Sequence, residues 1–128
     1  MRVLIADDSP VLRERLQTLL SEIAGIEIAG EARDADEAND SIQRLKPDVV
    51  ILDIRMPGGN GIDVLKKIKE KKSACAVIML TNYPYPQYRQ ASLDAGADFF
   101  FDKSTEFEKL SDALQGFMRD SKMRAGVK

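Results

Sequence analysis

The chain of 128 residues contains no histidine, so it lacks the commonest general base and the commonest metal ligand among the side chains. Any chemistry must therefore come from carboxylates, lysine or hydroxyl groups. Its only cysteine, Cys75, cannot form an internal disulfide, and the apolar run around it favours a buried structural thiol. This cysteine content fits a reducing compartment, and we expect a cytoplasmic protein.

Long hydrophobic segments are also absent. Apolar runs reach only about six residues, too short to cross a membrane, and the N-terminus leads into an acidic pair, unlike a signal peptide. The formal charge of -2 argues against direct nucleic-acid binding by the domain. A composition of 44% hydrophobic and 31% charged residues is that of one ordinary globular domain.

The most informative stretch that is present runs from Val49 to Pro57. The four apolar residues 49–52 predict a strand buried on both faces, and this run ends at Asp53. Pro57 and the glycines after it predict a loop. Asp53 should therefore lie at the carboxyl edge of a sheet, where open α/β sheets place their ligands. Taken alone, an aspartate in this place is better explained as a turn cap.

Strand and helix patterns alternate along the chain. Apolar runs predict strands at 3–6, 26–32, 49–52, 76–80 and 98–102. Helical spacing of apolar residues predicts helices at 10–25, 35–45, 62–72, 87–96 and 107–117. We expect a flavodoxin-like doubly wound (βα)5 fold, a parallel sheet of order 2-1-3-4-5 with helices on both faces. Residues 1–118 should form this domain, and 119–128 a flexible tail or truncated linker.

The residues that could carry chemistry follow the strands at one edge of this sheet. Asp7 and Asp8 follow the first strand, Asp53 the third, Thr81 the fourth and Lys103 the fifth. Individually they are better explained as helix caps, a turn residue and a surface lysine. Together, three neighbouring carboxylates require a proton or a cation, and Mg²⁺ suits such a site. A metal, a lysine and a hydroxyl around one carboxylate are the groups that receive a phosphoryl group.

This arrangement resembles the receiver domains of two-component response regulators. The matching residues, within a resemblance over residues 2–118, are Asp7, Asp8, Asp53, Met56, Pro57, Gly61, Thr81 and Lys103. The resemblance implies that Asp53 accepts a phosphoryl group from the phosphohistidine of a histidine kinase or phosphotransfer protein. The chain would then be a signalling switch, with no catalysis beyond its own phosphorylation and dephosphorylation.

The resemblance also implies roles for single residues. Mg²⁺ would be held by Asp8, Asp53 and the backbone carbonyl of Arg55, with Asp7 acting through water. Lys103 would contact the phosphoryl group, and Thr81 would move toward it. Phe100 matches the aromatic switch position, and we expect it to pass from an exposed to a buried state. Partners would then read the face formed by residues 87–117.

Three residues depart from the family pattern. Ser104 replaces the usual proline after the lysine, which leaves the Lys103–Ser104 peptide isomer open. Asn82 is larger than the usual residue after the threonine, and Phe100 lacks the hydroxyl of the commoner tyrosine. On the neighbouring residues, we expect Phe99 and Phe101 in the core and Phe100 on the opposite face.

Other functions remain open. A haloacid-dehalogenase-type phosphatase also uses an aspartate, Mg²⁺, threonine and lysine, but its second aspartate would fall at Arg55. A receiver-like module that binds partners without phosphorylation is the other alternative. No helix-turn-helix follows residue 118, so the chain is either a stand-alone receiver or the front of a longer regulator. The segments 83–86 and 103–104 look more like regulators of the two-helix DNA-binding kind or their stand-alone relatives. We expect no membrane partner, and a monomer or a phosphorylation-dependent dimer.

Overall fold

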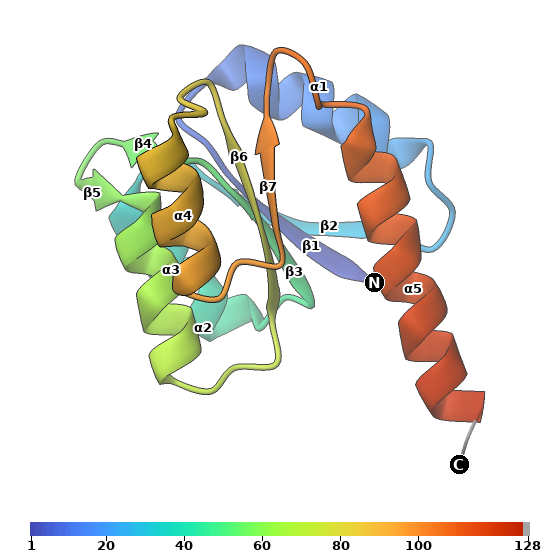
Figure 1. The fold of residues 1–128 in the computed structure, drawn as a ribbon. Coiled ribbons are helices and arrows are strands. Elements are labelled where there is room, and N and C mark those ends of the chain that lie inside the picture. The colour runs from blue at the N-terminus through green and yellow to red at the C-terminus, as the bar shows by residue number, and fades with distance from the viewer. Residues whose placement is uncertain (127–128) are drawn as a thin grey trace.

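The sheet is built around β3 (Val49–Leu52), whose four residues are buried and which pairs with a parallel strand on each side. The structure, a computed structural model, describes residues 1–126 (Figure 1). The other strands of the sheet are β1 (Arg2–Ala6), β2 (Glu27–Ala32), β6 (Ala76–Thr81) and β7 (Phe99–Asp102). Their order is β2-β1-β3-β6-β7, which confirms the predicted flavodoxin-like topology.

Helices cover both faces of the sheet (Figure 1). On one face lie α2 (Ala35–Leu45), α3 (Gly61–Glu70) and α4 (Pro86–Asp94), and on the other lie α1 (Pro10–Ser21) and α5 (Lys109–Gly126). Val50 and Leu52 pack toward the first group, and Val49 and Ile51 toward the second. Because both faces of β3 are covered, its sequence is apolar throughout rather than alternating.

Local signals explain where most helices begin. In α1 the hydroxyl of Ser9 accepts a hydrogen bond from Leu12 N, and a proline occupies the first turn. In α2 the Asp34 carboxylate caps Glu37 N. The last helix, α5, continues to Gly126 and therefore passes residue 118, although the assignment of 119–128 to a tail or linker stays a prediction. No helix within residues 1–126 is long and apolar enough to cross a membrane.

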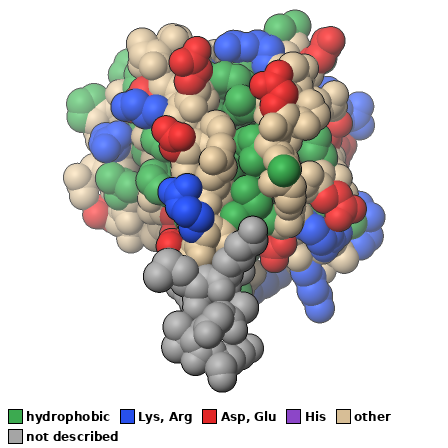
Figure 2. All heavy atoms as spheres, turned by 90° about the vertical axis from the view of Figure 1, so that its right-hand side faces the viewer, with side chains coloured by type: hydrophobic (Ala, Val, Ile, Leu, Met, Phe, Trp, Pro, Cys, Tyr) green, Lys and Arg blue, Asp and Glu red, His purple; other side chains and the backbone are tan. Residues whose placement is uncertain are grey.

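The aromatic residues of β7 follow only part of the prediction. Phe100 and Phe101 are buried on opposite faces of the sheet, as expected. The prediction that Phe99 lies in the core is wrong: this residue, on the edge strand β7, is 36% exposed beside Phe117 of α5. Figure 2 shows hydrophobic side chains in the middle of the side of the molecule that lies on the right in Figure 1, with charged ones around them.

Cys75 is buried, which confirms the structural thiol and raises its pKa to about 12.

The predicted loop after Asp53 forms a small antiparallel hairpin. It consists of β4 (Arg55–Met56) and β5 (Gly59–Asn60). The chain then passes directly under Asp53: Gly61 N donates to Ile54 O at 2.7 Å, and a Cβ at Gly61 would lie 1.9 Å from Asp53 O. Only glycine permits this approach, which fixes the start of α3 against the exit of β3.

We expect Gly61→Ala to destabilise the fold by roughly 1–3 kcal/mol or more, because the new Cβ must displace the backbone of Asp53. Urea unfolding followed by circular dichroism measures this change. Gly116→Ala is the matched control: its Cβ would come no closer than 3.8 Å to Arg119, and alanine favours a helix over glycine by about 0.5–1 kcal/mol. Equal stability of Gly61→Ala and wild type would contradict the close approach.

Candidate functional site

The residues predicted to carry chemistry meet at the carboxyl edge of the sheet, at the top of Figure 1. Asp7 and Asp8 follow β1, Asp53 follows β3, Thr81 ends β6 and Lys103 follows β7. Since β1 and β3 pair in parallel, their carboxyl ends reach the same edge side by side. The fold thus brings the three carboxylates together, as the strand order predicted.

The ammonium group of Lys103 lies between two buried carboxylates. Its Nζ is 2.6 Å from Asp7 Oδ2 and 3.0 Å from Asp53 Oδ2. All three side chains are at most 7% exposed, so little water screens these charges. Buried charges are tolerated when they are paired, and here every one of the three has a partner.

The remaining carboxylate oxygens are held by backbone amides. Asp53 Oδ1 accepts from Ile54 N at 2.8 Å, and Asp7 Oδ1 accepts from Ser9 N at the same distance. Arg13 Nη1 donates to the backbone oxygen of Asp7. Each carboxylate is therefore oriented by one amide and one ammonium, and its rotamer is set before any ligand arrives.

Asp8 is exposed, in contrast to its two acidic neighbours. One oxygen each from Asp7, Asp8 and Asp53 lies within 4.8 Å of the others. The single ammonium of Lys103 leaves a net charge of about two negative units on the ionised cluster. Clustered oxygen donors, excess negative charge and an open side at Asp8 together fit a hard divalent cation such as Mg²⁺.

Burial raises the pKa of Asp53 from its ordinary value of 3.8 to about 6. The nearby Lys103 ammonium opposes this shift, while the negative charge of Asp7 adds to it. The ionised form of Asp53, which is the nucleophilic form, is therefore less stable in the folded protein than in water. A further positive charge beside it would favour ionisation.

Thr81 is fully buried at the end of β6, and its hydroxyl accepts a hydrogen bond from Tyr83 N at 3.0 Å. Among the described residues, no hydrogen bond joins this hydroxyl to Asp53. Its proton remains available, because a hydroxyl can donate once while it accepts. Thr81 is thus beside the cluster without belonging to its ion pairs.

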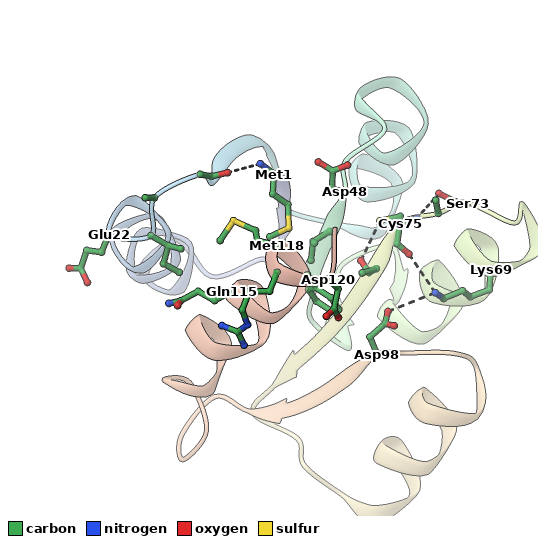
Figure 3. Close-up of a pocket in the computed structure, with 18 residues that line it drawn as sticks. Met1, Glu22, Asp48, Lys69, Ser73, Cys75, Asp98, Gln115, Met118 and Asp120 are labelled. Carbon is green, nitrogen blue, oxygen red and sulfur yellow. Dashed lines mark hydrogen bonds and ion pairs between the residues drawn. The ribbon is translucent and has the colours of Figure 1, made fainter. Parts of the chain in front are cut away.

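A cavity of about 1040 Å³ lies at the opposite, amino edge of the sheet (Figure 3). Its acidic residues Asp48 and Asp98 have structural partners, since they accept from the backbone amides of Arg2 and Val77, both at 2.8 Å. These carboxylates hold the starts of strands. None of the residues predicted to carry chemistry lines this cavity.

A family model described as the response regulator receiver domain matches residues 3–115. The chain belongs to this family. The match covers both the acidic cluster and Lys103, and it confirms the resemblance drawn from the strand-end residues. It places the chain in two-component signalling at the level of the family.

Curated relatives are longer than this chain. It is 37% identical over 122 residues to a protein-glutamate methylesterase/protein-glutamine glutaminase of Alkalilimnicola ehrlichii, covering 90% of the chain and 31% of that protein. It is 30% identical over 123 residues to the transcriptional regulatory protein DesR of Bacillus subtilis, covering 96% and 61%. The chain therefore spans from about a third to about three-fifths of the length of these relatives.

Solved receiver domains share the fold. The response regulator domain of Thermotoga maritima CheB superposes with a TM-score of 0.80 at 33% identity, covering 94% of each chain. The isolated receiver (REC) domain of RcsB from Salmonella enterica serovar Typhimurium, solved with the phosphomimetic BeF3-, gives a TM-score of 0.82 at 31% identity. That match covers 91% of this chain and 88% of the other.

Phe100, which the resemblance assigns to the aromatic switch position, is already buried. Phe100 is 5% exposed and packs in the cluster beneath α4, near Tyr88. Arg89 closes over it, with its guanidinium carbon 5.8 Å from the ring centroid and Nη1 3.4 Å from Phe100 O. The expectation that Phe100 starts from an exposed state is therefore wrong. The reason is that α4 covers this face of β7.

The side chain of Arg55 belongs to a cluster that the sequence did not predict. Its guanidinium lies 4.0 Å from the centroid of the Tyr83 ring and donates to the Tyr88 hydroxyl at 3.3 Å. Tyr85 packs between the two other tyrosine rings, so packing of the loop against α4 explains Tyr83 and Tyr85. Three tyrosines within six residues were the signal from which the sequence could have predicted this aromatic cluster.

The Lys103–Ser104 peptide is trans.

We expect Asp53→Asn to be more stable than wild type at about pH 8 without divalent cations, by about 1–3 kcal/mol. Because the folded-state pKa of Asp53 is raised, its ionised form destabilises the fold, whereas asparagine stays uncharged. The folded state binds the proton of Asp53 more tightly than the unfolded state does. The stability that this proton contributes is therefore lost as the pH rises from about 4 to 6.

Urea unfolding of both proteins across this pH range gives the difference, in which the effects of titrating groups remote from Asp53 cancel. The two curves should converge below about pH 4. A lower stability of Asp53→Asn at about pH 8 would contradict the raised pKa.

Proposed function

We propose that this chain is a phosphorylation-controlled signalling switch in which Asp53 accepts a phosphoryl group from the phosphohistidine of a histidine kinase. The observation that carries the proposal is the buried Lys103 ammonium between Asp53 and Asp7, next to the exposed Asp8. If Lys103 only stabilised the fold, an ion pair with one carboxylate would be sufficient. A lysine plus surplus carboxylates in an open acidic cluster favours the transfer of an anionic group with a divalent cation.

In the proposed step, a carboxylate oxygen of Asp53 attacks phosphorus while the bond from phosphorus to the donor nitrogen breaks. The imidazole leaves with that electron pair and takes up a proton, and Asp53 becomes an acyl phosphate. Lys103 can neutralise a phosphoryl oxygen without moving far, because its Nζ is already 3.0 Å from Asp53 Oδ2. Thr81 can donate its hydroxyl proton to another phosphoryl oxygen once it turns toward Asp53.

Mg²⁺ would supply positive charge for the oxygens of the transferred group. We assign its binding to Asp8, Asp53 and the backbone carbonyl of Arg55, with Asp7 acting through water. Asp7 keeps its carboxylate on Lys103 and Ser9 N, which favours an indirect role. The cation would compensate the charge that one ammonium leaves on three carboxylates.

The signal would leave through α4, β7 and α5. With Phe100 buried from the start, the change would be a repacking of Phe100 under α4 rather than the burial of an exposed ring. A phosphatase is disfavoured, because Arg55 takes the place of the second aspartate and its guanidinium is stacked on Tyr83. The group that reads this face would be a partner protein or an attached output domain, since the curated relatives of this chain are longer proteins.

Phosphorylation should occur on Asp53 alone. With acetyl phosphate and Mg²⁺, intact-mass measurement should show one added phosphoryl group on wild type and none on Asp53→Asn, since the amide cannot act as the nucleophile. Asp40→Asn, which removes an exposed carboxylate on α2, is the control and should be phosphorylated like wild type. An adduct that persists in Asp53→Asn would refute the assignment.

Mg²⁺ should raise the melting temperature of the wild type. The stabilisation follows from binding to the folded state and amounts to about 2.7 kcal/mol at a hundredfold excess over Kd. Asp8→Asn should lose most of this response, whereas Asp40→Asn should keep it. Thermal unfolding with Mg²⁺, compared with K⁺ at matched ionic strength, separates specific binding from screening. A full response in Asp8→Asn would remove Asp8 from the metal site.

A further inference from the structure

The side chain of Lys103 cannot form a turn by accepting from a backbone amide, because an ammonium group donates hydrogen bonds but accepts none. At two other strand ends, the side-chain oxygen of the site residue accepts a hydrogen bond from the backbone N–H two residues later in the chain. Asp7 does so with Ser9 N at 2.8 Å, and Thr81 with Tyr83 N at 3.0 Å. These turns fix the direction in which the chain leaves the strand.

At the end of β7 the residue before the lysine forms this turn. Asp102 Oδ1 accepts from Ser104 N at 2.8 Å, so the turn encloses Lys103. Where proline follows the lysine, as in the receiver domains that the sequence resembles, this donor does not exist. Lys103 N itself donates to Thr81 O at 2.9 Å, which ties the same point to β6.

Glu106 closes a second ring on the same segment. Its Oε1 accepts from Asp102 N at 3.1 Å, and its own N–H donates to Asp102 O at 2.8 Å. The other carboxylate oxygen is 2.9 Å from Lys109 Nζ, at the start of α5. The carboxylates of Asp102 and Glu106 therefore hold segment 102–106 through hydrogen bonds to its own backbone amides. Lys103 extends from this segment into the acidic cluster.

We propose that Asp102 and Glu106 are positioning residues for Lys103. Their hydrogen bonds hold the exit of β7 so that the ammonium lies between Asp7 and Asp53. Neither side chain is bonded to the carboxylates of the cluster, so both act through the backbone that carries Lys103. This inference rests on the proposed role of Lys103 in the phosphorylation of Asp53.

Paired substitutions test the proposal. Asp102→Ala should lower the initial rate of phosphorylation by acetyl phosphate and Mg²⁺ by about tenfold or more, because small displacements of a charge-stabilising group are costly. Asp102→Asn keeps the Oδ1 acceptor and should retain most of the wild-type rate. Glu106→Ala and Glu106→Gln form a second pair with the same expectation. Glu108→Ala removes a nearby exposed carboxylate and should have no effect.

A second measurement needs no phosphorylation. Lys103 is 7% exposed, so an amine-reactive ester should label it slowly in wild type compared with the exposed Lys66. Peptide mass mapping should find faster labelling of Lys103 in the two alanine variants and protection in Asp102→Asn and Glu106→Gln. Circular dichroism confirms that each variant is folded. If Asp102→Ala does not fold, the Glu106 pair decides.

Wild-type rates and wild-type protection in the alanine variants would overturn the proposal. Equal losses in the alanine and amide variants would also overturn it, because charge rather than hydrogen bonding would then matter. If wild type itself acquires no phosphoryl group on Asp53, the proposed function fails, while the labelling of Lys103 still decides whether Asp102 and Glu106 position it.

Discussion

The contact of one ammonium with two buried carboxylates is the interaction on which this site depends. Asp7 and Asp53 come from adjacent strands, and their negative charges would repel each other in a medium that water does not screen. Leaving a buried charge without a partner costs about 3–5 kcal/mol. Lys103 reaches them from the far side of β6 and so joins three strand ends. The same ammonium that stabilises the resting cluster is in place to meet an incoming anion.

The architecture of the sheet explains why these groups can be both buried and accessible. Alternating strand residues fill the two apolar layers on the faces of the sheet. At the carboxyl edge each strand passes into a loop, so the residues that follow the strands lie at the boundary of these layers. Asp53 lies at that boundary, with Gly61 passing beneath it and Asp8 open to solvent beside it. Backbone amides set the carboxylate rotamers, so the site is organised by turns as much as by ion pairs.

The helices differ in how firmly they are attached. Within α3, five residues are buried, whereas the only buried residue of α4 is Ser92. The hydroxyl of Ser92 has no hydrogen-bond partner among the described residues, and α4 begins without a side-chain cap. Few buried apolar contacts mean low local stability. A repacking near Phe100 would therefore meet the least resistance at α4.

Several features followed from the sequence alone. The apolar run 49–52 is long enough to require a strand covered on both faces, and alternation of strands with helices permits few topologies. Because parallel strands end at one edge, the positions of Asp7, Asp8, Asp53, Thr81 and Lys103 in the chain were sufficient to predict that they meet. Family membership followed from the same residues.

Other features depended on the tertiary structure. The burial of Phe100 is decided by α4, whereas Phe99 on the edge strand β7 stays partly exposed although Phe101 on the same face is buried. Alternation along the strand separates Phe100 from Phe99 and Phe101, but it has no signal for how far the rest of the fold covers each ring. The contact between Lys103 and Asp53 joins residues 50 positions apart, so its geometry depends on the packing of all the strands between them. Sequence periodicity specifies which face or edge a residue occupies, whereas distances between side chains are set only when the elements pack.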